Sequence, residues 1–126
     1  MPDRRASRVL IVEDDAQIAA VLGETLRDEG FDVRRASDGQ EGLSILSQWT
    51  PDAIILDLMM PVMDGPTFRA AHRQLPPPVG MVPVIILSGA RDARAQAEAL
   101  AATAVITKPF DLDEVVERVR TVCRPG

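Results

Sequence analysis

Cysteine is nearly absent from this sequence, and so are long hydrophobic runs. Cys123 is the only cysteine among the 126 residues, so no disulfide can form within the chain and a reducing compartment suits it best. No apolar segment approaches the length that crosses a bilayer, and the amino terminus lacks the pattern of a signal peptide. We therefore expect a cytoplasmic protein that has no membrane partner.

An excess of basic residues is also missing. The formal net charge is −5, and direct binding of nucleic acid would favour a basic face instead. The apolar fraction of 46% and the charged fraction of 26% are typical of a soluble globular protein. The length suits one domain, so we expect residues 1–126 to form a single unit without an effector domain.

Short apolar segments alternate with helical patterns along the whole chain. The strand-like segments are residues 8–12, 31–36, 53–56, 82–87 and 104–107. Between and after them, helices are predicted at about 16–29, 39–49, 66–75, 91–101 and 112–122. Strands that are apolar on both faces indicate a parallel sheet covered by helices on each side. We predict an α/β fold with a doubly wound, five-stranded parallel sheet.

Polar side chains follow four of the five predicted strands. The first strand ends at Glu13, Asp14 and Asp15, the third at Asp57, the fourth at Ser88 and the fifth at Lys108. In open α/β sheets, ligands bind beyond the carboxyl ends of the strands, where the strand order reverses. If the strand order is 2-1-3-4-5, the first and third strands are neighbours there, and two or three carboxylates then meet a hydroxyl and an ammonium group.

Such a group of carboxylates favours a cation and a phosphoryl group. Two carboxylates at 4 Å repel each other by up to ~4 kcal/mol at an effective dielectric of ~20, so a compensating charge is needed. Mg²⁺ prefers oxygen ligands and typically takes one or two carboxylates, and an aspartate can attack phosphorus. Ser88 and Lys108 could then hold the phosphoryl oxygens. Taken singly, the acids could equally be helix caps and turn residues; their joint appearance at the strand ends favours the site.

Four segments together resemble the receiver domain of two-component response regulators. They are "VLIVEDD", "IILDLMMPVMDG", "VIILSGA" and "VITKPF", and the resemblance covers about residues 7–123. It implies a flavodoxin-like fold with the strand order 2-1-3-4-5. It also implies a signalling switch rather than a conventional enzyme, in which Asp57 is phosphorylated by a histidine kinase or a histidine phosphotransfer protein and the output is a downstream protein bound in trans.

The same resemblance implies roles for the other site residues. Mg²⁺ (or Mn²⁺) would be held by Asp14, Asp57 and the backbone carbonyl of Met59, with Glu13 acting through water. Ser88 and Lys108 would bind the phosphoryl oxygens, and the Lys108–Pro109 peptide bond would be cis.

The chain departs from the family pattern near the fifth strand, where Val105 stands in place of the usual aromatic residue. This departure leaves open a second interpretation, a phosphate-independent adaptor that only binds proteins. An aspartyl phosphohydrolase would need a second acid two residues after Asp57, and a flavin carrier would need hydroxyls and glycines where Glu13 begins the acidic triplet. The single histidine, His72, is predicted to be a surface residue of a helix that ends at the Pro76–Pro78 run.

Overall fold

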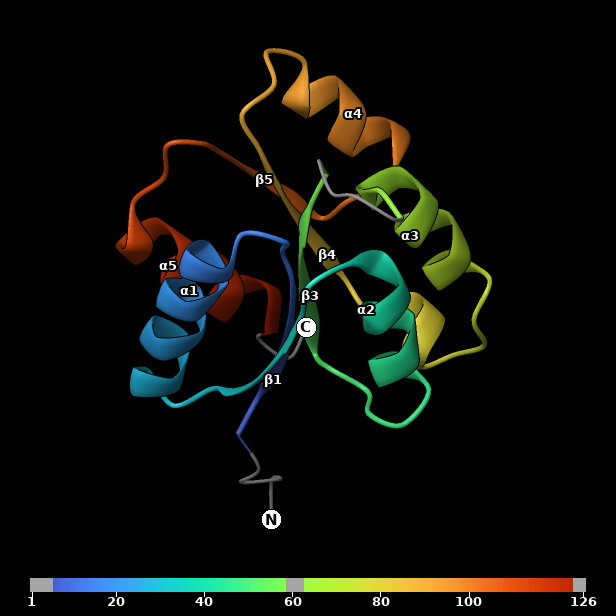
Figure 1. Cartoon of the computed structure of the whole chain (residues 1–126), viewed down its shortest axis with the longest axis horizontal. Helices are drawn as coiled ribbons and strands as arrows, with labels where there is room; N and C mark the ends of the chain where they lie inside the picture. The colour runs from blue at the N-terminus through green and yellow to red at the C-terminus, as the bar shows by residue number, and fades with distance from the viewer. Residues whose placement is uncertain (1–5, 59–62, 124–126) are drawn as a thin grey trace.

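The computed structural model describes residues 6–58 and 63–123, which form five strands and five α-helices around one sheet (Figure 1). The strands are β1 (Arg8–Val12), β2 (Asp32–Ala36), β3 (Ala53–Asp57), β4 (Val84–Ser88) and β5 (Ala104–Thr107). The helices are α1 (Ala16–Asp28), α2 (Gly39–Leu46), α3 (Gly65–Arg73), α4 (Ala93–Ala99) and α5 (Leu112–Cys123), with a short 3-10 turn, η1 (Val79–Met81).

All strand pairs are parallel and lie in the order β2-β1-β3-β4-β5. The predicted fold class and strand order are therefore confirmed. Helices α1 and α5 cover one face of the sheet, and α2, α3 and α4 cover the other (Figure 1). β3 and β4 are buried along their full length, as expected for strands that lie between two helical layers.

Two hydrophobic clusters hold the helical layers to the sheet. On one face, Leu10 and Ile54 pack with Phe68 of α3 and Ala97 of α4. On the other face, residues of β1, β3 and β4 pack with Leu22 of α1 and with the valines of α5. The alternation of side chains along each strand sends neighbouring residues into opposite clusters.

Aspartates begin several of the helices. The Asp15 carboxylate accepts hydrogen bonds from the amides of Gln17 and Ile18, and the Asp64 carboxylate accepts one from Thr67. These side chains satisfy amides that lack partners within the first turn. Asp15 therefore acts as a helix cap, which is the alternative reading that the sequence allowed for members of the acidic triplet.

Two of the predicted helices are several residues too long at their ends. Helix 39–49 ends at Leu46, and helix 91–101 is confined to α4, Ala93–Ala99. The Lys108–Pro109 peptide bond is cis, as predicted. No helix within residues 6–58 and 63–123 is long and apolar enough to span a bilayer.

The prediction that His72 lies at the surface is wrong. His72 is completely buried in the structure and stacks on Phe68, with ring centroids 6.1 Å apart. Its two ring nitrogens lie 2.8 Å from Arg69 Nη1 and 2.8 Å from the carbonyl oxygen of Val79. These partners compensate the imidazole for the loss of water, so a polar ring is tolerated on the inward face of α3.

Candidate functional site

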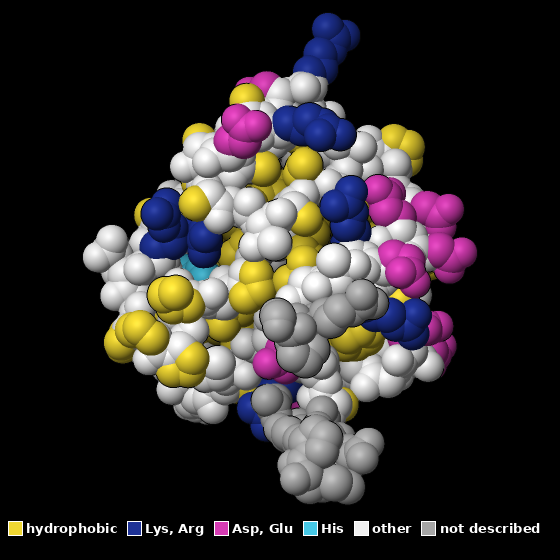
Figure 2. All heavy atoms as spheres, turned by 180° about the vertical axis from the view of Figure 1, so that it is seen from behind, with side chains coloured by type: hydrophobic (Ala, Val, Ile, Leu, Met, Phe, Trp, Pro, Cys, Tyr) yellow, Lys and Arg dark blue, Asp and Glu magenta, His cyan; other side chains and the backbone are white. Residues whose placement is uncertain are grey.

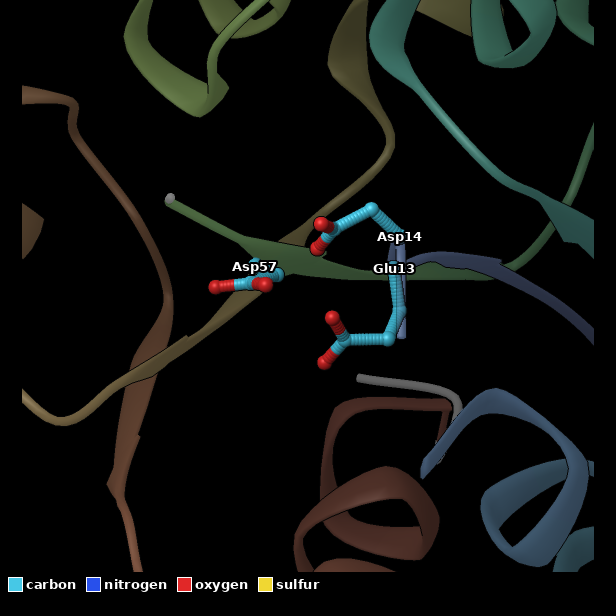
Figure 3. Close-up of side chains that lie close together, drawn as sticks. All are labelled: Glu13, Asp14 and Asp57. Carbon is cyan, nitrogen blue, oxygen red and sulfur yellow. The ribbon is translucent and has the colours of Figure 1, made fainter. Parts of the chain in front are cut away.

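Three carboxylates meet at the carboxyl ends of β1 and β3. Glu13 and Asp14 follow β1, while Asp57 is the last residue of β3, and ligand oxygens of all three lie within 4.8 Å of one another (Figure 3). Glu13 and Asp57 are buried, whereas Asp14 is exposed. The arrangement follows from the sheet, because β1 and β3 are adjacent and parallel, with Val12 paired to Leu56.

Lys108 brings an ammonium group to two of these carboxylates. Its Nζ lies 3.5 Å from Glu13 Oε1 and 3.6 Å from Asp57 Oδ1. The lysine follows β5, and its backbone amide donates a hydrogen bond of 2.9 Å to the carbonyl oxygen of Ser88 at the end of β4. Since Lys108 is the only lysine in the chain, the one primary ammonium side chain stands at this pocket.

Glu13 carries the largest electrostatic perturbation at the site. Burial raises the pKa of Glu13 from 4.5 to about 8, and the neighbouring Asp57 carboxylate adds to the increase. The amide of Asp15, which donates to Glu13 Oε2 at 3.2 Å, and the ammonium of Lys108 act in the opposite direction. The two buried carboxyl groups of Glu13 and Asp57 therefore have the Lys108 ammonium as their shared positive neighbour. A further cation bound at this site would be stabilised by the remaining negative charge.

Ser88 ends β4, and the β3–β4 register pairs the preceding residue, Leu87, with Asp57. The Ser88 hydroxyl is buried and accepts a hydrogen bond of 3.1 Å from the amide of Ala90. Its own O–H can still donate, because a hydroxyl has one donor in addition to its acceptor positions. Met59, whose carbonyl the resemblance assigns to the metal, lies outside the described residues.

Gly65 closes the loop that follows Asp57. Its amide donates a hydrogen bond of 3.1 Å to the carbonyl oxygen of Leu58. A Cβ at this position would lie 2.6 Å from Leu58 Cα and 3.0 Å from the Asp57 carbonyl oxygen. Only glycine lets the start of α3 come so near to the strand that carries Asp57.

The donor set fits a hard divalent cation. Glu13 Oε1 is buried and lies 3.5 Å from the Lys108 ammonium, and the exposed Asp14 carboxylate offers a ligand that a cation can reach from solvent. Carboxylate and carbonyl oxygens are the ligands that Mg²⁺ prefers, whereas soft sulfur or imidazole ligands are not part of the cluster.

Comparison with known proteins identifies the family. The family model described as "Response regulator receiver domain" matches residues 9–120. The chain belongs to the response regulator receiver family. Its place in two-component signalling, which the four sequence segments indicated, is thereby confirmed.

Curated relatives of this receiver domain are longer than it is. The chain is 40% identical over 119 residues to the transcriptional regulatory protein PrrA of Mycobacterium tuberculosis, an alignment that covers 93% of this chain and 50% of that protein. It is 36% identical to the DNA-binding dual master transcriptional regulator RpaA of Synechocystis, covering 93% and 49%. The chain thus spans about half the length of the curated relatives it matches.

Solved receiver structures have the same fold over nearly the whole chain. A putative response regulator from Chloroflexus aurantiacus superposes with a TM-score of 0.87 at 34% identity, covering 94% of this chain and 98% of the other. The response regulator TrrA of Thermotoga maritima, solved in complex with Mg²⁺ and BeF, superposes with a TM-score of 0.80 at 28% identity, covering 92% and 98%.

Proposed function

We propose that this receiver domain is a phosphoacceptor switch in which Asp57 takes a phosphoryl group from a phosphorylated histidine of a partner protein. The observation that carries the proposal is the position of Asp57, a buried carboxylate within 4.8 Å of the Glu13 and Asp14 ligand atoms and 3.6 Å from the Lys108 ammonium. A purely structural aspartate does not require these neighbours, since burying the two carboxylates of Glu13 and Asp57 beside one lysine costs stability.

The proposed reaction is a direct transfer between two side chains. One Asp57 carboxylate oxygen attacks phosphorus, the P–N bond to the donor histidine breaks, and the imidazole keeps the electron pair and regains a proton from solvent. The product is an acyl phosphate on Asp57. The chain contributes position and charge, because phosphoryl transfer depends mainly on alignment and on compensation of the equatorial oxygens.

Each remaining site residue has a proposed role in that transfer. Asp14 and Asp57 would hold Mg²⁺ or Mn²⁺ together with the Met59 carbonyl, and Glu13 would act through a bound water. When bound, the cation would neutralise charge on the phosphoryl oxygens. The Lys108 ammonium and the Ser88 hydroxyl would donate hydrogen bonds to those oxygens.

The partners follow from the family and from the extent of the match. We propose a histidine kinase or a histidine phosphotransfer protein as the phosphodonor. We propose that residues 1–126 act as one unit that contacts no nucleic acid itself and passes the signal to a downstream protein. The match covers only about half of the transcriptional regulators PrrA and RpaA, so the proposal for this chain does not include their activity as transcriptional regulators.

The experiment is labelling with a small phosphodonor. The protein is incubated with acetyl phosphate and Mg²⁺, and the modified residue is mapped by mass spectrometry. We expect one phosphoryl group on Asp57, and loss of labelling in Asp57→Asn or after EDTA treatment. Asp28→Asn, which removes an exposed carboxylate of α1, is the matched control and should label normally. Full labelling of Asp57→Asn would disprove the proposal.

A further inference from the structure

A second polar pocket lies at the opposite end of the sheet from Asp57. It has a volume of about 410 Å³ and is lined by residues of α3, η1 and the segments that lead into β4 and β5: Arg69, Arg73, Gly80, Met81, Val82, Pro83, Ala101 and Thr103. Val82 and Pro83 precede β4, and Thr103 precedes β5, so the pocket opens at the amino ends of these strands. The Asp57 site lies at the opposite, carboxyl end of the sheet, so the two sites are separate.

Two guanidinium groups line this pocket without an acidic partner. Among the described residues, no carboxylate forms an ion pair with Arg69 or Arg73. Burial lowers the pKa of the Arg69 guanidinium, and the nearby charge of Arg73 adds to the decrease. Figure 2 shows one group of basic side chains at the left edge of the molecule and others at the top and near the centre, while acidic side chains are densest at the right edge. The pocket therefore combines two positive charges.

Hydrogen bonds fix the position of the Arg69 guanidinium but do not use all of its N–H donors. It is only 7% exposed. Its Nε donates to the carbonyl oxygen of Leu100 at 2.9 Å, Nη2 donates to that of Ala101 at 2.9 Å, and Nη1 donates to His72 Nδ1 at 2.8 Å. A guanidinium carries five N–H groups, so two remain without a partner among the described residues. A buried cation whose acceptors are all neutral gains from a nearby anion.

The remaining lining is largely apolar. Val82 is buried, Pro83 is partly buried, and Met81 is 75% exposed, which makes it one of the two exposed large hydrophobic residues of the described chain. Pockets of roughly 300–1,000 Å³ with apolar walls and a few convergent polar groups are the usual size and character of small-molecule sites. The planar fork of arginine matches a carboxylate or a phosphate group in two-point contact.

We propose that this pocket binds a small organic anion, whose oxyanion group contacts Arg73 and Arg69 and whose hydrocarbon part contacts Met81 and Val82. The proposal goes beyond the phosphoacceptor function and is independent of it. The two arginines select the charge, and the apolar lining selects an organic molecule over an inorganic ion.

The test uses glutarate as the organic probe and inorganic phosphate as the comparison. Each is titrated into the full chain at constant ionic strength, while NMR follows the Nε–Hε signals of Arg69 and Arg73 and the backbone amides of Ala101–Thr103. We expect saturable shifts with glutarate and weaker binding of phosphate. Arg73→Gln should weaken glutarate binding by about tenfold or more, because it removes a charge-assisted hydrogen bond. Arg94→Gln removes an exposed arginine of α4 outside the pocket and should leave the affinity unchanged.

A second variant separates the apolar contribution from the charge. Met81→Ser should weaken glutarate binding and leave phosphate binding unchanged. Chemical shifts that never saturate would contradict the proposal that the pocket binds an anion. Equal glutarate affinity in wild type and Arg73→Gln would contradict it as well. Phosphate binding as tight as glutarate would overturn the organic class of the ligand. Phosphorylation of Asp57 in Arg73→Gln is measured in parallel, and it should proceed normally, so a failure of the phosphoacceptor proposal is seen separately.

Discussion

Acid should destabilise this protein through His72, the only histidine in the chain. Arg69 Nη1 can only donate, so His72 Nδ1 must accept, and His72 Nε2 carries the proton that it donates to the Val79 carbonyl oxygen. Protonation of Nδ1 would place two donors face to face in a buried site. Burial lowers the pKa of His72 below 6.5, the Arg69 charge lowers it further, and only the hydrogen bond to Val79 opposes the decrease.

The sign and the size of the effect follow from linkage. Below about pH 6.5 the unfolded chain binds a proton at His72 that the folded chain excludes, so the free energy of unfolding decreases as the pH falls. The limiting slope is about 1.4 kcal/mol per pH unit, and the loss between about pH 7.5 and 5.5 approaches 1.4 kcal/mol while folded His72 stays neutral.

Glu13 titrates in the same range with the opposite sign. Its pKa is raised to about 8 in the folded state, so the folded chain binds the extra proton and gains stability as the pH falls through about 8 towards 4.5. A wild-type pH profile alone would mix the two effects. The contribution of His72 is therefore obtained as the difference between wild type and a His72 variant.

Urea unfolding of wild type and His72→Gln, measured at a series of pH values, gives that difference. Glutamine offers one acceptor and two donors but does not titrate, so it can replace both contacts of the neutral ring. We subtract the free energy of unfolding of His72→Gln from that of wild type. This difference should be constant above about pH 7, and at about pH 5.5 it should be lower by about 1 kcal/mol or more. A difference that is constant over the whole range would refute the neutral, buried state of His72.

Four further measurements test other parts of the structure. Ala101 has φ 54°, so Ala101→Gly should raise the free energy of unfolding by about 0.5–1 kcal/mol in a urea titration, and a decrease would contradict the strain. Gly65→Ala should lower it by about 1–3 kcal/mol and slow phosphorylation of Asp57, because the new Cβ would meet backbone atoms; normal labelling would contradict the close approach. Mg²⁺ at a hundred times its Kd should stabilise wild type by about 2.7 kcal/mol in thermal unfolding, and an equal effect in Asp14→Asn would remove that residue from the metal site. With beryllofluoride and Mg²⁺, amide shifts should be larger in residues 88–101 than around Val105, since valine is too short and stiff to relocate as an aromatic ring does.

Much of the site could be predicted from the order of elements. Apolar strands such as Ile54–Leu56 require two covering layers, and this requirement fixes a parallel sheet whose carboxyl ends share one edge. The convergence of Glu13, Asp14 and Asp57 follows from that topology. The sequence could not show that Glu13 and Asp57 are buried while Asp14 is exposed. The burial of each carboxylate depends on the direction in which its side chain leaves the end of the strand.

The sequence by itself determined the two helical layers around a parallel sheet and the residue types at the strand ends, because these depend on local hydrophobic periodicity and on chain connectivity. The strand order was expected from the resemblance to receiver domains. Only the tertiary structure decided the surroundings of His72. His72 follows Phe68 by four residues and Arg69 by three, so its side chain lies on the same side of α3 as each of them, but the helical period does not say whether that side faces water or the core. The carbonyl oxygens of Val79, Leu100 and Ala101 decide that it is buried. Val79 lies in η1 beyond the end of α3, Leu100 and Ala101 follow α4, and these oxygens satisfy polar groups that would otherwise need water.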